Sequence, residues 1–231
     1  MKKTTFYINS TPSLLLGKSS NKLFLYIHGK YGNKEGAEPF AAIAVACGWQ
    51  VLSFDLPEHG SRNNEKETFV PWLVVPEILD IMAYVKKCWN IVSLFAESIG
   101  VWFSLLSLNA EKFEKCLFVS PLIDMQRFIN DIMTENNISE IRLKKEQQIN
   151  IGIEKLSWNY LMYARKHPID KWLSKTKILY GEQDELVARN TVEIFSKQFG
   201  CELSIIQNAK HWFGAPQQLP ILKKWIIDCL S

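Results

Sequence analysis

Short apolar runs alternate with segments of helical spacing along most of the 231-residue chain. The runs are nearly continuous in hydrophobic residues, which is typical of parallel strands in a sheet that is covered on both faces. The strands are predicted at Leu23–His28, Trp49–Asp55, Ile91–Ala96, Cys116–Ser120, Lys177–Tyr180 and Glu202–Ile206. This alternation predicts an α/β protein with a doubly wound, mostly parallel sheet.

Helical segments separate these strands. They are predicted at Glu35–Cys47, Trp72–Lys87, Ile99–Leu108, Arg189–Phe199 and Gln217–Cys229. The N-terminal residues Thr4–Leu16 are expected to add an antiparallel hairpin at one edge of the sheet. In open sheets of this kind, functional side chains gather where the parallel strands end.

Residues 122–168 interrupt the alternation between the fourth and fifth core strands. This stretch has mixed helical signals and no convincing strand, so a helical insertion is expected there. Lying over the carboxyl ends of the strands it would act as a lid, although a pair of ordinary packing helices explains the pattern equally well. No linker or repeat divides the rest, so residues 1–231 are expected to form a single domain.

Composition excludes several classes of protein. Hydrophobic residues make up 47% and charged residues 22%, which is typical of a globular chain and not of a disordered one. The net charge of +3 is too small to indicate a nucleic-acid binder. The 5 cysteines are scattered without a CxxC pair, so no metal site is expected and a reducing, cytoplasmic location fits best. No apolar run is long enough to span a membrane, and the N-terminal residues are too polar for a signal peptide.

A serine stands at the junction of a predicted strand and a predicted helix, in Ala96-Glu97-Ser98-Ile99-Gly100. A nucleophile on such a sharp turn needs small residues two positions before and after it, and Ala96 and Gly100 meet that need. The turn would also direct the N–H of Ile99 toward a reacting carbonyl. The alternative is that Ser98 only caps the helix that follows.

A serine hydroxyl needs a base and an acid that orients the base. His211 follows the last predicted strand and Asp184 follows the strand before it. The chain order is therefore Ser98, Asp184, His211, which is the order associated with a serine on a strand–turn–helix junction. Asp124, after the fourth strand, is the alternative acid.

These residues together resemble the α/β-hydrolase family along nearly the whole chain. His28-Gly29 resembles the family's oxyanion-loop motif, residues 55–61 its D-x-P-G-x-G-x-S turn, and residues 96–100 its nucleophile elbow. The segments 181–184 and 210–211 are similar to its acid and histidine loops. The chain departs from the pattern at Ala96, where the first elbow glycine is usual, and at Glu58 and Ser61 in the turn.

The resemblance implies a hydrolase with Ser98, Asp184 and His211 as its catalytic residues and with no cofactor or metal. The oxyanion would be held by the N–H groups of Ile99 and of Lys30 or Tyr31. His28 and Gly29 would shape that loop rather than take part in proton transfer.

The resemblance also implies a small acyl substrate, cleaved at an ester or thioester bond. Apolar residues of the insertion would favour a substrate with an apolar portion, or would form the insertion's own core: Phe128, Ile132, Met133, Trp158, Tyr160, Met162 and Tyr163. A peptidase or amidase of similar fold is the second possibility. A hydrolase-like scaffold that binds without turnover is the third.

Overall fold

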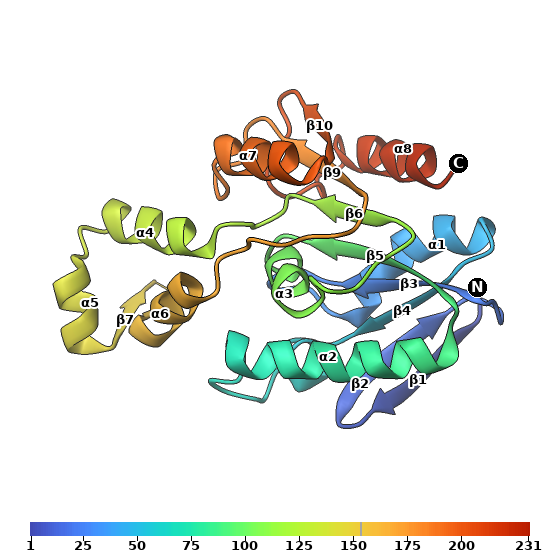
Figure 1. Ribbon diagram of the computed structural model, residues 1–231, viewed down its shortest axis with the longest axis horizontal. Coiled ribbons are helices and arrows are strands. Elements are labelled where there is room, and N and C mark those ends of the chain that lie inside the picture. The colour runs from blue at the N-terminus through green and yellow to red at the C-terminus, as the bar shows by residue number, and fades with distance from the viewer. Residues whose placement is uncertain (153) are drawn as a thin grey trace.

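The computed structural model describes residues 1–152 and 154–231. Its centre is an eight-stranded sheet in the order β1-β2-β4-β3-β5-β6-β9-β10 (Figure 1). The strands are β1 (Lys3–Ile8), β2 (Thr11–Leu16), β3 (Lys22–Ile27), β4 (Gln50–Phe54), β5 (Ile91–Glu97), β6 (Cys116–Val119), β9 (Thr176–Gly181) and β10 (Glu202–Ile206).

The six strands from β4 to β10 in that order pair in parallel. The hairpin β1–β2 is antiparallel and joins the sheet through β4. The predicted doubly wound, mostly parallel sheet is therefore confirmed, and the expected N-terminal hairpin is present at its edge.

Helices cover both faces of the sheet. Helices α1 (Glu38–Ala46) and α8 (Leu219–Leu230) pack on one face, and α2 (Pro71–Cys88), α3 (Ile99–Ser107) and α7 (Arg189–Phe199) pack on the other. Because both faces are covered, Leu23, Phe24 and Leu25 on the central strand β3 are all fully buried. This explains why the strands appear in the sequence as continuous apolar runs.

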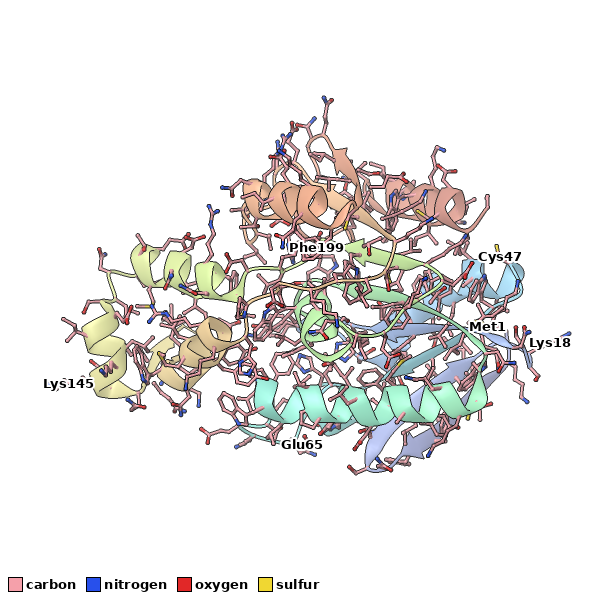
Figure 2. The ribbon with its side chains drawn as sticks, in the orientation of Figure 1. Met1, Lys18, Cys47, Glu65, Lys145 and Phe199 are labelled. Atoms are coloured by element: carbon pink, nitrogen blue, oxygen red, sulfur yellow. The ribbon has the colours of Figure 1, made fainter. Side chains whose placement is uncertain are left out.

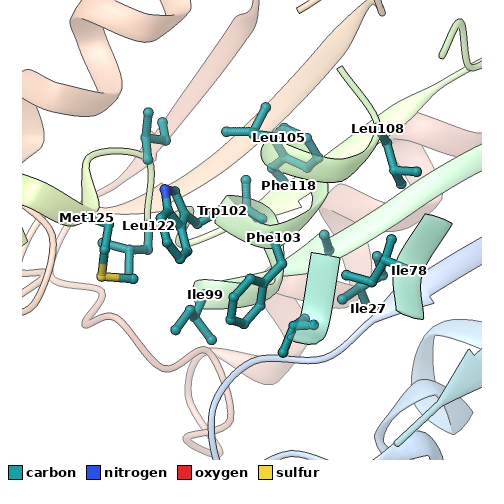
Figure 3. Packing of buried hydrophobic residues seen from close by; sticks show 14 of the residues in the cluster. Ile27, Ile78, Ile99, Trp102, Phe103, Leu105, Leu108, Phe118, Leu122 and Met125 are labelled. Atoms are coloured by element: carbon teal, nitrogen blue, oxygen red, sulfur yellow. The ribbon is translucent and has the colours of Figure 1, made fainter. Parts of the chain in front are cut away.

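Helix α3 is the most deeply buried helix described in this packing. Its residues Trp102, Phe103 and Leu105 are at most 1% exposed. Figure 3 shows Trp102 beside Leu122 and Met125, and Leu105 beside Phe118 of β6. Burial on this scale fixes the start of α3 rigidly, and Ser98 stands directly before that start.

Residues 122–168 lie outside the sheet as an insert between β6 and β9. They form α4 (Met125–Glu135), α5 (Glu140–Glu146), β7 (Gln148–Ile151), β8 (Glu154–Ser157) and α6 (Trp158–Lys166). Figure 1 shows these elements together in one lobe, and Figure 2 places Lys145 of that lobe at the opposite end of the molecule from Met1 and Lys18.

The expected helices of the insert are present as α4, α5 and α6, but the strand pair there was not predicted from the sequence: β7 and β8 form an antiparallel two-stranded sheet. Each strand has only four residues, which is too short for a clear alternating pattern. The pairing brings Ile149 opposite Leu156, and both are buried. Two apolar residues that meet only across a hairpin leave little periodic signal in the sequence.

Over the residues described, no helix has both the length and the apolar character needed to cross a bilayer.

Candidate active site

Ser98 occupies a tight turn between β5 and α3, with φ 48° and ψ −121°. This conformation is strained for a residue with a side chain, and such strain is typical of functional positions. Backbone hydrogen bonds hold it: the Ser98 N–H donates to Val119 O at 3.0 Å, and the Leu122 N–H donates to Ser98 O at 3.1 Å. The turn is thus fixed to the end of β6.

Gly100 permits the close approach of α3 to the sheet. A Cβ atom at this position would lie 2.6 Å from His28 O and 2.7 Å from Ile27 O, so any side chain would push the helix away. Ala96, which stands where the nucleophile-elbow pattern has its first glycine, is fully buried and its methyl group is accommodated.

Ser98 precedes α3 but its side chain makes no capping hydrogen bond. Its Oγ instead lies 2.9 Å from Nε2 of His211. The other ring nitrogen of His211, Nδ1, lies 2.7 Å from Oδ2 of Asp184. The structure therefore brings the three predicted residues together in one hydrogen-bonded row.

The surroundings of Asp184 fix its carboxylate in place. Oδ1 accepts from the N–H groups of Leu186 and Val187, both at 2.9 Å, and the side chain is fully buried. With Oδ1 occupied in this way, Oδ2 faces His211. A proton on Nδ1 that donates to Asp184 leaves Nε2 free to accept the proton of Ser98.

Asp124, the alternative acid, is used differently. It caps α4, where Oδ1 accepts from the Arg127 N–H at 2.9 Å, and it is exposed. The two glutamates near Asp184 in the sequence have other partners. Glu182 accepts from the Asn208 N–H, and Glu185 forms an ion pair with Lys210. Of these acids, Asp184 is the one that contacts His211.

The loop after β3 lies against the serine. A Cβ atom on Gly29 would be 3.2 Å from Ser98 Cβ. His28 is 1% exposed and is held at both ring nitrogens: Nδ1 lies 2.7 Å from Gly29 O, and Nε2 accepts from Leu56 N–H at 3.1 Å. An acceptor at Nε2 requires the proton to be on Nδ1, so His28 is neutral and shapes the loop.

Three N–H groups in the turn after Ser98 and in the loop after β3 remain available. Ile99 is the first residue of α3 and has no acceptor within the helix. Among the residues that the structure describes, the N–H groups of Lys30 and Tyr31 also make no backbone hydrogen bond. These are the donors expected for an oxyanion, and both candidates in the loop remain open.

Because His28 is buried in its neutral form, the free energy of unfolding should depend on pH. Burial lowers its pKa to about 4 from 6.5. Between these values the unfolded chain binds the extra proton, so the free energy of unfolding should fall as pH drops from 6.5 to 4, by about 3 kcal/mol for this group. Denaturant titrations across this range should show a smaller pH slope for His28→Gln than for the wild type.

The exposed His167 provides the matched control for that experiment. His167→Gln makes the same substitution at an exposed position, so the effect of removing a buried histidine is the difference between the slopes of the two variants. Equal slopes for the wild type and His28→Gln would show that His28 is not buried in its neutral form.

Lys34 and Asp55 form a buried ion pair beneath this loop, which the sequence did not indicate. The Lys34 N–H and Nζ donate to the two carboxylate oxygens at 2.8 and 2.7 Å, and Ser61 N–H donates at 2.9 Å. Burial alone would raise the pKa of Asp55, but the bonds from Lys34 and Ser61 outweigh it and the pKa is lowered. The pair ties the loop after β3 to the turn after β4.

Glu97, directly before the serine, is a second group that sequence reasoning did not single out. Burial raises the pKa of its carboxyl to about 7, while Tyr26 and the charge of His211 act in the opposite direction. At the end of a strand, the sequence pattern does not distinguish a half-buried glutamate such as Glu97 from an exposed one.

The side chains of Lys30 and Tyr31 bind the insert. Both donate to the carboxylate of Glu154, the first residue of β8. A second ion pair joins Lys155 to Glu67 at 2.9 Å. The β7–β8 hairpin is therefore tied to the loop that lies against Ser98, a contact between residues about half the chain apart.

Apolar residues of the insert pack toward α2 and α3. Tyr160 stacks on Trp102 with ring centroids 5.7 Å apart, and Trp72 contacts both Tyr160 and Tyr163. Met133 is buried, while the insert residues Phe128, Ile132, Trp158, Tyr160 and Tyr163 are partly buried against the core. Within the described residues, no group of histidine, cysteine or carboxylate side chains is arranged to hold a metal ion.

No protein-family model matches the sequence, and no curated protein matches it either. Solved structures do match over almost the full length. Est1E from Butyrivibrio proteoclasticus with ferulic acid bound has 20% identity and a TM-score of 0.75, and 98% of this chain and 97% of that chain are covered.

Two further structures are similar. The α/β hydrolase domain-containing protein 10 from mouse has 17% identity and a TM-score of 0.77, with complete coverage of both chains. A monoacylglycerol lipase from Paleococcus ferrophilus has 14% identity and a TM-score of 0.70, with 95% of this chain and 98% of that chain covered. At these identities the likeness concerns the fold.

Proposed function

We propose that this chain, which has the α/β-hydrolase fold, is a serine hydrolase that cleaves a carboxylic ester or thioester. The observation that carries the proposal is the row of hydrogen bonds from Ser98 Oγ to His211 Nε2 and from His211 Nδ1 to Asp184 Oδ2, at 2.9 and 2.7 Å. A binding scaffold has no need for all three groups in this order.

The reaction would run through an acyl-enzyme. Ser98 Oγ attacks the carbonyl carbon as His211 Nε2 takes its proton, and Asp184 stabilises the imidazolium that forms. The N–H groups of Ile99 and of Lys30 or Tyr31 hold the oxyanion. When the tetrahedral intermediate collapses, the bond to the leaving alcohol or thiol breaks and His211 returns the proton to it. Water then attacks the acyl-enzyme by the same route and releases the carboxylic acid.

The proposed substrate is a small molecule with an apolar portion. The support from this chain is that Trp72 of α2 and Tyr160 of the insert form an aromatic contact next to α3, the helix that begins after Ser98. The similar Est1E was solved with ferulic acid, an aromatic acid, and another similar protein is a monoacylglycerol lipase. Ester hydrolysis with acyl chains of graded length tests this preference, and an equal rate for all chains would contradict it.

The bond type is tested with paired substrates that share one acyl group. We expect p-nitrophenyl butyrate to be cleaved much faster than the p-nitroanilide of the same acid. Faster turnover of the anilide would identify an amidase or peptidase instead, and absence of turnover of either by the purified chain would favour a binding scaffold.

We also propose that the insert, residues 122–168, is a lid of a single domain spanning residues 1–231. Its tie to the loop beside Ser98 consists of exposed groups, since the side chains of Lys30 and Glu154 are 37% and 42% exposed. Exposed ion pairs contribute only about 0.2–1 kcal/mol. The tie is therefore weak enough to break and re-form as substrate enters and product leaves.

Glu154→Gln should favour the open lid. An ion pair of this strength corresponds to roughly a 1.5- to 5-fold change in an equilibrium. We expect kcat/KM for a long-chain ester to rise by about that factor relative to p-nitrophenyl acetate. The measurement is the ratio of the two kcat/KM values at low salt.

Glu140→Gln is the matched control, because Glu140 pairs with Arg165 inside the insert. It should leave the ratio unchanged. An unchanged ratio for Glu154→Gln as well would show that the contact with Lys30 and Tyr31 does not control access.

A further inference from the structure

His211 lies on an irregular segment, residues 207–218, between β10 and α8. Its side chain must reach Ser98 and Asp184 at the same time, so its main chain has to be held in place by contacts outside regular structure. The adjoining side chains do not supply these contacts by burial, since Trp212 is 70% exposed and Lys210 is also exposed.

Ser120 holds the main chain of His211 from one side. It directly follows β6, is 2% exposed, and its Oγ donates to His211 O at 2.5 Å. The preceding residue, Val119, accepts the N–H of Ser98 at 3.0 Å. The end of one strand therefore holds both the serine and the histidine.

Gln218 holds the same main chain from the other side. It precedes α8 and is 8% exposed. In the amide orientation that satisfies both of its neighbours, Oε1 accepts from Lys210 N–H at 2.7 Å and Nε2 donates to Trp212 O at 2.6 Å. One buried side chain thus bonds to the residue before His211 and to the residue after it.

Ser120 and Gln218 together leave the backbone of residues 210–212 little freedom. Removing either hydrogen bond of the buried Gln218 amide should lower the stability of the folded protein, because a buried polar group is then left without a partner. Because these bonds hold the main chain on both sides of His211, their loss should also affect catalysis. A displacement of about 1 Å at a reacting group can reduce a rate by about 100-fold.

We propose that Ser120 and Gln218 are positioning residues that fix the main chain of His211 so that its imidazole bridges Ser98 and Asp184. We call this pair the His211 clamp. The proposal rests on the proposed serine hydrolase function. Neither residue touches the reacting atoms, so both act through His211 alone.

Variants of Gln218 test the clamp. Gln218→Met keeps the approximate size and removes both hydrogen bonds. We expect kcat for p-nitrophenyl butyrate to fall about 10- to 100-fold in this variant, with KM changed less than about twofold.

The adjacent Gln217 is exposed and provides the matched control. Gln217→Met should keep the wild-type kcat. The rate of Ser98 labelling by a fluorophosphonate should fall in parallel with kcat in Gln218→Met. The low-field proton NMR signal of the His211 Nδ1 proton should weaken in the same variant, which loss of stability alone would not cause in protein that remains folded.

Ser120→Ala removes only the hydroxyl group of Ser120. It therefore tests the His211 clamp independently if Gln218→Met does not fold. We expect about a 10-fold lower kcat for it. Wild-type kcat and labelling in the folded variants would overturn the clamp and leave the proposed function intact. A wild-type protein that neither hydrolyses esters nor reacts with the fluorophosphonate would instead overturn the proposed function.

Discussion

Ser98→Ala is expected to reduce ester hydrolysis by roughly 100,000-fold to a million-fold, to the level that the binding groups and oxyanion donors alone sustain. Alanine keeps the backbone conformation at φ 48° but has no oxygen to form the acyl-enzyme. His211 would then have no proton to accept from the enzyme. The measurement is kcat/KM for p-nitrophenyl butyrate, together with the thermal unfolding midpoint.

Ser107→Ala, in the helix that follows Ser98, is the control. The Ser107 hydroxyl donates to Phe103 O and has no contact with His211 among the bonds described. We expect wild-type kcat/KM for this variant. Activity of Ser98→Ala within about tenfold of the wild type would show that Ser98 is not the nucleophile.

Asp184→Asn should reduce kcat by roughly 10,000-fold while the protein stays folded. The carboxylate accepts a hydrogen bond from His211 Nδ1 at 2.7 Å. An asparagine amide can donate there instead, which stabilises the tautomer with its proton on Nε2. That tautomer cannot accept the proton of Ser98, so the base is lost although the geometry is kept.

Asp124→Asn tests the alternative acid in parallel. Asn is also a good helix cap, so α4 should be preserved and kcat should remain within about twofold of the wild type. A large loss of kcat in Asp124→Asn with a small loss in Asp184→Asn would mean that the acid comes from the end of β6.

Much of the fold follows from local patterns in the sequence. The core strands are buried on both faces and therefore appear as continuous apolar runs such as Leu23–His28. The serine turn is also local, because the small residues Ala96 and Gly100 are needed within five residues. The order of Ser98, Asp184 and His211 reflects the order of the strands, and so it can be read without coordinates.

Other features depend on contacts that the sequence does not encode locally. The hairpin β7–β8 is stabilised across strands by Ile149 and Leu156. The choice between Asp184 and Asp124 depends on which carboxylate faces His211, and that is decided by the N–H groups of Leu186 and Val187. Sequence patterns alone left both acids possible.

The positions of buried charged and polar residues depend on partners that are distant in the sequence. Lys34 is 6% exposed because it pairs with Asp55, yet a lysine is normally expected at the surface. Ser120 bonds to the carbonyl of His211, 91 residues away along the chain. Gln218 bonds to the two neighbours of His211, Lys210 and Trp212. Only the folded arrangement shows that these two polar side chains hold the same loop.

Reaction of the wild-type protein with a fluorophosphonate, followed by peptide mass mapping, tests whether Ser98 is the nucleophile. We expect a single phosphonyl adduct on the peptide that contains Ser98, and no adduct in Ser98→Ala. We also expect much slower labelling in Asp184→Asn. Absence of an adduct on Ser98 in a folded wild-type protein, or an adduct on another serine that accounts for the hydrolysis, would contradict the claim.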